Sequence, residues 1–361
     1  MPVHLRQWYP ARSPNEAKDA GIAPPGDFVT GDFVTGDIVT DDFVPEISAM
    51  PAIMGYPNSL SPSRTNDFLT CPMLYRLRTI DRLPEEPSLA AIRGTLVHRA
   101  LEWLFDLPAP ERTIEATGAL LDKAWQELQE TSPAEAEALC VQLAGSVDEA
   151  QADARTITTQ ILAPAEPLLR TYFAMEDPTR LDPAARELAV RAQLDAGLVL
   201  RGFVDRLDRN SNGDVRIVDY KTGRSPGSGF ETKAMFQMRF YALTWWRMTG
   251  EIPRLLQLLY LGNSEVLRYQ PDEDDLRATE RKILAIRAAI AASADSGTFA
   301  PNPGRHCDWC SFRSVCPAWG ALPIPLPDRS TWPATRDLET TPAVAPQLIE
   351  RVRNIRDGIE E

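Results

Sequence analysis

The residues best suited to chemistry lie in a turn-rich stretch near the middle of the chain. Asp205 ends the run Gly202-Phe203-Val204-Asp205, and Asp219 and Lys221 frame an Asp-Tyr-Lys triplet. Residues two apart on a β-strand face the same side, so we expect Asp219 and Lys221 to point together. Hard divalent cations prefer several carboxylates, and a lysine beside such an ion can orient a water molecule or neutralise a developing oxyanion. The alternative is a surface ion pair that contributes well under about 1 kcal/mol.

Three further polar residues lie on two predicted helices. His98 lies on the helix 94–105, beside its apolar stripe, although a lone helical histidine is more often structural than a ligand. Gln237 and Tyr241 are four residues apart on the helix 231–249 and therefore share a face. An amide and a phenol there can hold a nucleotide phosphate or base, and core packing is the alternative.

The elements that position these residues follow from periodicity and turn signals. Three runs of alternating or β-branched residues, separated by turn residues at 195–197 and 210–214, predict an antiparallel meander that carries Asp205 and Asp219 on neighbouring strands. The predicted strands are 187–194, 198–207, 215–220, 255–261 and 266–269, and further helices are predicted over 65–82 and 272–296. This αβββαβ order within a helical surround indicates an α+β (mixed α/β) fold and not a doubly wound parallel sheet.

Together these segments resemble the RecB-family exonucleases of the PD-(D/E)XK nuclease superfamily. The resemblance runs from about residue 59 to 320, with its motifs in the family's order. The segments that carry it are Leu60-Ser61-Pro62-Ser63 with Cys71-Pro72, Arg93-Gly94-Thr95-Leu96-Val97-His98, Gly202-Phe203-Val204-Asp205, Asp219-Tyr220-Lys221 and Gln237-x-x-x-Tyr241. The resemblance implies a restriction-endonuclease-like αβββαβ core.

The resemblance also implies roles for single residues. The family's metal ligands, with Mg²⁺ or Mn²⁺ as the cofactor, correspond to His98, Asp205, Asp219 and the backbone carbonyl of Tyr220. Lys221 would be the catalytic lysine, Gln237 and Tyr241 match a motif that contacts DNA, and Glu187 matches a further acid of the family. The implied activity is metal-dependent hydrolysis of DNA phosphodiester bonds by an exonuclease acting on single-stranded ends, in DNA repair or recombination.

Four of the 5 cysteines form a second pattern, Cys71 followed by Cys307-x2-Cys310-x5-Cys316-Pro317. In a reducing cytosol such a quartet indicates metal or cluster ligation and not disulfides, and zinc is the usual ion for C-x2-C. The spacing resembles the iron–sulfur staple of AddB-type nuclease domains and CRISPR-associated single-strand exonucleases, which implies a structural 4Fe-4S cluster. We expect Trp309 and Phe312 to shield this cluster from solvent, and Cys140 to be a buried apolar filler.

A second hypothesis is a non-catalytic, cluster-bearing DNA-binding subunit of a helicase–nuclease or CRISPR-adaptation-type complex. The intact His98, Asp205, Asp219 and Lys221 argue against it, because a pseudo-nuclease is free to lose them. The chain has no Walker-type G-x-x-x-x-G-K-[ST] motif, so a helicase or repair complex would have to be a separate partner.

Charge is distributed unevenly along the chain. The net charge is −13, from 38 Lys+Arg and 51 Asp+Glu, which by itself argues mildly against a polyanionic partner. Yet residues 199–260 contain ten basic and six acidic residues, and this local charge of +4 predicts a basic groove for a phosphate backbone. Arg224, beside Thr222-Gly223, is the substrate-binding candidate of this stretch.

The remaining segments define the domain organisation. Residues 1–58, with a pentad repeat at 26–45, predict a disordered acidic leader. Residues 59–320 form the predicted nuclease domain, with a solvated acidic helical insertion at 108–182, and 321–361 form a Pro-rich tail with a short charged helix. No apolar run reaches the roughly 20 residues of a membrane helix, and the N-terminus has no signal-peptide core. We therefore expect a cytoplasmic protein with no membrane partner.

Overall fold

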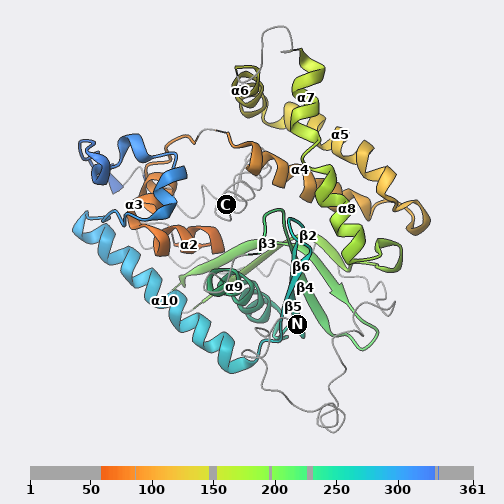
Figure 1. Ribbon diagram of the computed structural model, residues 1–361. Coiled ribbons are helices and arrows are strands. Elements are labelled where there is room, and N and C mark those ends of the chain that lie inside the picture. The colour runs from red at the N-terminus through yellow and green to blue at the C-terminus, as the bar shows by residue number, and fades with distance from the viewer. Residues whose placement is uncertain are drawn as a thin grey trace, which may run out of the picture.

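A mixed six-stranded sheet lies at the centre of the molecule (Figure 1). The computed structural model describes residues 58–85, 87–145, 153–194, 197–225, 231–329 and 332. The pentad repeat and the predicted tail helix at 345–359 lie outside these residues. Within them, no helix combines the length and the hydropathy needed to cross a bilayer.

The sheet is built around a long central strand. The strands are β1 (Ser59–Leu60), β2 (Ala185–Gln193), β3 (Val199–Arg209), β4 (Val215–Lys221), β5 (Leu255–Tyr260) and β6 (Glu265–Tyr269). As the turn signals predict, β2, β3 and β4 form an antiparallel meander. β5 runs parallel to β4 and antiparallel to β6, so the sheet is mixed and the predicted α+β class is confirmed.

Helices cover both faces of the sheet, which explains why every residue of β4 is buried. One face packs against α2 (Pro62–Thr70), α9 (Glu231–Thr249) and α10 (Glu273–Ser296). The other packs against a lobe of α4 (Leu89–Leu104), α5 (Ile114–Thr131), α6 (Pro133–Ala144), α7 (Ala154–Leu162) and α8 (Glu166–Met175), which gathers to one side in Figure 1. Neighbouring residues of β4 therefore belong to different cores: Ile217 faces α9, and Val218 faces the lobe.

The predicted helix 65–82 is wrong as a single element. Ser61 caps α2 by accepting a hydrogen bond from the Arg64 N–H, but the helix stops at Cys71, whose backbone is extended. Pro72 explains the stop, because proline disfavours the helical conformation of the residue before it. A short helix, α3 (Pro72–Tyr75), and a π-helical turn, Arg76–Ile80, follow. Cys71 therefore lies between two helices and not within one.

Candidate active site in the fork of the sheet

The sheet opens into a fork between β3 and β4, and the predicted catalytic residues lie around it. One edge of β3 pairs with β1 through its first two residues and with β4 from Arg206 onward. Between these contacts, residues 201–205 have no strand partner on that edge within the described part of the sheet. Asp205 lies at the base of the fork, where its Oδ2 accepts a hydrogen bond from the Tyr220 N–H at 2.7 Å. The Asp205 carboxylate thus accepts the hydrogen bond that the Tyr220 N–H would otherwise donate to a backbone carbonyl of a neighbouring strand.

Asp219 and Lys221 lie at the end of β4 and contact each other, as the strand periodicity predicts. Lys221 Nζ lies 2.8 Å from Asp219 Oδ2, and both side chains are buried. Gln237 of α9 bridges the pair, because its Nε2 donates to Asp219 Oδ1 at 3.2 Å and its Oε1 accepts from Lys221 Nζ at 3.1 Å. The DNA contact expected of Gln237 stays a prediction. In this structure the amide positions both charged groups.

Three side chains of metal-ligating types converge at Asp205. His98 Nδ1 lies 3.3 Å from Asp205 Oδ2 and 4.0 Å from Glu187 Oε1. Among the described residues, this is the one group of three or more His, Cys, Asp or Glu whose ligand atoms all lie within 4.8 Å of one another. Bond lengths of about 2.0–2.6 Å keep the ligand atoms of one cation within about 5 Å of each other, so this donor set fits a divalent ion. Ligation by Asp219 and the Tyr220 carbonyl stays a prediction.

Tyr241 packs into the core against the strand that carries Asp205. It is 2% exposed, and a Cβ added to Gly202 would lie 2.6 Å from its Cε1 atom. No side chain larger than a hydrogen atom fits at this position of β3 while the ring keeps its place. The glycine of one motif and the tyrosine of another are therefore parts of one packing contact. The DNA contact expected of Tyr241 stays a prediction.

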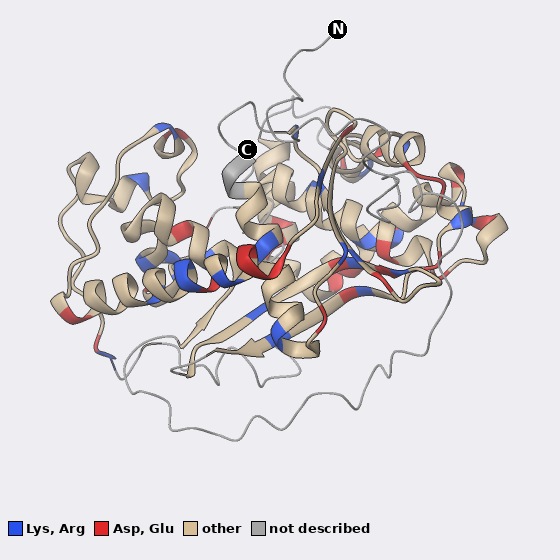
Figure 2. Cartoon of the chain, turned by 90° about the horizontal axis from the view of Figure 1, so that it is seen from below, with Lys and Arg blue, Asp and Glu red and all other residues tan. Residues whose placement is uncertain are grey.

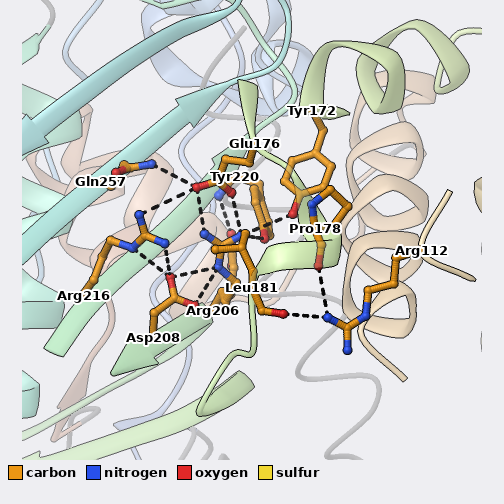
Figure 3. A network of polar contacts seen from close by, with 11 residues as sticks. Arg112, Tyr172, Glu176, Pro178, Leu181, Arg206, Asp208, Arg216, Tyr220 and Gln257 are labelled. Atoms are coloured by element: carbon orange, nitrogen blue, oxygen red, sulfur yellow. Dashed lines mark hydrogen bonds and ion pairs between the residues drawn. The ribbon is translucent and has the colours of Figure 1, made fainter. Parts of the chain in front are cut away.

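A buried network of charged side chains lies behind Tyr220 (Figure 3). Arg206 Nη1 donates to Tyr220 Oη and to Glu176 Oε2, both at 2.7 Å. Asp208 Oδ2 accepts from Arg206 Nε at 3.2 Å and from Arg216 Nε at 2.8 Å. Burial raises the pKa of Tyr220, which keeps its hydroxyl protonated. The network fixes the one residue that separates Asp219 from Lys221.

The helical lobe contributes to this network, so the prediction of a merely solvated insertion is wrong. Glu176 follows the last residue of α8, and Tyr172 of α8 is fully buried, with its ring edge-on to Tyr220 at 5.7 Å. A signal for the network is present in the strand sequences, because Asp208 and Arg216 pair across the β3–β4 ladder. Charged residues in buried strands need partners, and the ladder places Asp208 and Arg216 opposite each other.

The positive charge of residues 199–260 is only partly at the surface. Arg206 and Arg216 are fully buried, where Asp208 and Glu176 balance their charges. Arg224, the predicted substrate contact, is exposed in the loop that follows β4. In the view of Figure 2, Lys and Arg are interspersed with Asp and Glu over the helices and strands. The predicted basic groove therefore depends on fewer arginines than the sequence count indicates.

A cavity beside α3 brings together four cysteines from distant parts of the chain. Its empty volume, with the open mouth included, is about 380 Å³, and its lining includes Cys71, Cys307, Cys310 and Cys316. All four are free thiols. The backbone N–H groups of Asn302 and Gly304 donate to Cys71 Sγ at 3.3 Å and to Cys307 Sγ at 3.4 Å. Figure 1 shows the C-terminal loop beside α3, as the predicted quartet requires.

The residues expected to shield this cavity behave differently from one another. Phe312 is 3% exposed and packs with Cys71, as predicted. Trp309 is 58% exposed and does not line the cavity, so its predicted shielding role is wrong. It ends a 3₁₀ turn, Arg305–Trp309, in which residues two apart point in different directions, so the turn that buries Cys307 exposes Trp309. Cys140 is partly buried among the lobe helices, where burial raises its pKa.

Comparison with known proteins agrees with this geometry. The model of the PD-(D/E)XK nuclease superfamily matches residues 59–317. The Gene 69 protein of Mycobacterium phage L5 is 31% identical over 139 residues, which cover 37% of this chain and 45% of that protein. The alignment thus spans less than half of this relative's length.

Two solved structures are similar at 15% sequence identity. The structure of SSO0001 has a TM-score of 0.31, with 72% of this chain and 86% of that chain covered. A protein of Eubacterium rectale described as "Putative exonuclease" has a TM-score of 0.45, with 75% and 91% covered. The family model, in contrast, matches well over half of this chain. The chain therefore belongs to the PD-(D/E)XK nuclease superfamily.

Proposed function

We propose that this chain is a metal-dependent DNA nuclease, a RecB-like exonuclease that hydrolyses phosphodiester bonds at single-stranded ends in DNA repair or recombination. One observation carries the proposal. Asp205 Oδ2 accepts a hydrogen bond from the N–H of Tyr220, the residue between Asp219 and Lys221, at 2.7 Å, and His98 Nδ1 lies 3.3 Å from the same oxygen. Membership of a nuclease superfamily supports the general activity.

The donor atoms around the fork suit Mg²⁺ or Mn²⁺. Carboxylate and carbonyl oxygens are the ligands that these ions prefer, and an imidazole nitrogen is compatible with Mn²⁺. His98, Asp205, Asp219 and the Tyr220 carbonyl would hold the cation. When bound, such an ion acts as a Lewis acid towards a phosphate oxygen and lowers the pKa of water.

Lys221 is the candidate for the residue that orients the attacking water molecule or stabilises negative charge on the phosphate. Its ammonium group is fully buried, lies 2.8 Å from Asp219 Oδ2 and donates to Gln237 Oε1 at 3.1 Å. These two contacts hold the ammonium group in one place before substrate arrives. A positive charge fixed in this way can orient a water molecule for attack at phosphorus or stabilise the negative charge that develops on the phosphate.

Cleavage of end-labelled single-stranded and double-stranded DNA with Mn²⁺ tests the proposal. Asp219→Ala and Lys221→Ala should each lower cleavage by about 10²-fold or more, since each removes a group that stabilises transition-state charge. Lys123→Ala is the control, because this lysine is exposed and contacts the Trp103 ring in the helical lobe. Retained cleavage in either fork variant would contradict the site. Binding without cleavage by the native protein would favour the non-catalytic subunit.

We further propose that the four cysteines hold a structural 4Fe-4S cluster. Cluster ligation is supported by the common cavity and by the two backbone N–H groups that donate to the sulfurs.

Anaerobic purification tests the cluster. The expected preparation is brown, absorbs visible light and contains about four iron and four sulfide per chain. A colourless preparation with one zinc per chain would refute the cluster and support the zinc alternative. Trp309→Ala should leave the iron content unchanged, since this side chain is exposed and does not cover the cavity.

A further inference from the structure

One face of β2 and β3 lies open beside the fork. The apolar core beneath the helical lobe draws its sheet residues from β4, β5, β6 and the residue after β5. No residue of β2 or β3, two strands that the structure describes in full, belongs to this core. Ala189 of β2 is exposed, and Phe203 of β3, which lies opposite it, is partly exposed. The lobe therefore leaves this part of the sheet accessible to solvent.

Side-chain alternation identifies the residues on the open face. Val190 of β2 and Val204 of β3 pack in the core beneath α9. The alternation of β2 is regular beyond Glu187, which has a left-handed backbone with φ of +44°. The residues next to these core positions therefore point to the opposite face, and they are Ala189 and Arg191 on β2 and Arg201 and Phe203 on β3.

Arg191 and Arg201 lie directly opposite each other on this face. Opposite residues of antiparallel strands have Cβ atoms about 4.5–5.5 Å apart, so the two side chains can reach a common ligand. Both arginines are partly exposed. A guanidinium group binds a phosphate through two parallel hydrogen bonds, and a phosphate between two guanidinium groups offsets the repulsion of their charges. The pair is therefore suited to a phosphate of the DNA backbone.

The same face of β3 leads from the arginine pair to the fork. Asp205 follows Arg201 by four residues, which is about 13 Å along a strand, and Phe203 lies midway between them. At the fork, His98 of α4 lies 3.3 Å from Asp205. A phosphate at the arginine pair is thus a different phosphate from one at Asp205, and a base between the two phosphates can lie over the Phe203 ring.

An aromatic ring at this place favours single-stranded DNA. Unpaired bases stack on aromatic side chains, and this stacking is tolerant of base identity because every base has a π-face. A base within a duplex reaches such a ring only after it is unstacked and unpaired. A basic contact to the backbone next to an aromatic ring is the combination typical of surfaces that bind single strands without sequence preference.

We propose that Arg191, Arg201 and Phe203 form a binding track for single-stranded DNA, in which the arginines hold a phosphate and the ring stacks on a base. This inference rests on the proposed function and names the residues that select a single strand. Arg191 lies outside the segment 199–260, so the positive charge of that segment does not include it. The register of β2 against β3 is what brings this arginine beside Arg201.

A purely structural role for the two arginines is the competing explanation, because ion pairs of Arg191 and Arg201 could tie β2 and β3 to their neighbours. The two roles predict different effects of substitution. Loss of structural ion pairs lowers Tm and leaves the binding of DNA as it is in the native protein. Loss of a phosphate contact weakens the binding of DNA and changes its dependence on salt.

Fluorescence anisotropy of the full-length protein with labelled DNA in EDTA measures binding without cleavage. Arg191→Ala/Arg201→Ala should weaken Kd for a single strand by at least about tenfold, because it removes charge-assisted hydrogen bonds. The slope of log K against log salt should become shallower by about 0.7, the value for one phosphate contact of a single strand. Arg191→Lys/Arg201→Lys keeps both charges and should restore the native slope.

Phe203→Leu tests the ring separately. Leucine keeps an apolar side chain and loses aromatic stacking, so Kd for a single strand should weaken by about fivefold or more, while Kd for a blunt duplex stays native. Arg268→Ala is the matched control, because it removes an exposed strand arginine from β6, which β4 and β5 separate from β3. It should keep the native Kd and the native slope.

These measurements separate the outcomes. A native Kd and slope in Arg191→Ala/Arg201→Ala, with cleavage by the native protein in Mn²⁺, would refute the track and leave the proposed function standing. A lower Tm with a native slope would also refute it and assign the arginines a structural role. An equal loss for single strand and duplex in Phe203→Leu would refute the stacking. If the native protein binds single strands through these residues and cleaves no DNA, the proposed function fails and the track stands.

Discussion

Replacing Gly202 by alanine tests how Tyr241 positions β3, the strand that carries Asp205. The added Cβ would lie 2.6 Å from Tyr241 Cε1, about 1 Å closer than ordinary contact. Neither partner can move aside freely, because Gly202 pairs with Val190 in the sheet and the tyrosine is 2% exposed. Overpacking of this kind costs about 1–3 kcal/mol. Tyr241→Ala leaves a cavity and costs about 3–5 kcal/mol.

The double variant makes this reasoning falsifiable. With the ring removed, the alanine at position 202 has room, so the double variant should be more stable than the sum of the single effects by about 1–3 kcal/mol. Urea unfolding in EDTA measures all four free energies. Gly118→Ala is the control, since nothing lies within 4 Å of its Cβ position in α5, and it should stabilise by about 0.5–1 kcal/mol. Additive effects within about 0.5 kcal/mol would refute the contact.

Two other predictions concern buried charges. Arg206→Met should lower the free energy of unfolding by about 3–5 kcal/mol, because it leaves buried carboxylates short of a counter-charge, whereas Arg209→Met, from a pair about a third exposed, should cost under about 1 kcal/mol. Burial raises the pKa of Asp67 from 3.8 to about 6. The folded protein therefore binds the Asp67 proton more tightly than the unfolded chain does. As a result, the contribution of Asp67 to the free energy of unfolding falls as pH rises from 4 to 6. In urea unfolding, the stability of the native protein minus that of Asp67→Asn should therefore decrease over this interval by up to about 3 kcal/mol, and a pH-independent difference would contradict the burial argument.

The fold follows from the sequence wherever the signal is local. The turn at 210–214 is an example, because Asn210 Oδ1 accepts from the N–H groups of Asn212 and Asp214, and Gly213 supplies φ of +86°. The helix 65–82 fails for an equally local reason, since Pro72 outweighs an amphipathic pattern that continues through it. The parallel pairing of β4 and β5 depends on contacts far apart in sequence, and periodicity alone does not determine it.

Only those features of the site that depend on residue type and on spacing along the chain can be predicted from the sequence. Asp219 and Lys221 share a face because strand geometry requires it. The left-handed φ of Glu187 has no local signal, since nothing in the neighbouring residue types demands it. The contact of Gly202 with Tyr241 is equally hidden, because it joins a strand to a helix that begins far along the chain. Such features arise from tertiary packing.

The end of β4 is held from both faces, and this arrangement explains why a charged network lies behind the Asp219-Tyr220-Lys221 triplet. Because side chains alternate along a strand, Asp219 and Lys221 meet Gln237 on one face while Tyr220 meets Arg206 on the other. The ladder between β3 and β4 ends at Val218, so residues 219–221 of β4 have no partner on β3. The hydrogen bond from Arg206 to the Tyr220 hydroxyl has a defined length and direction, so it fixes the peptide groups on either side of that residue. The buried charges thus act on the fork through backbone position, and the helical lobe that supplies Glu176 helps to support the candidate site.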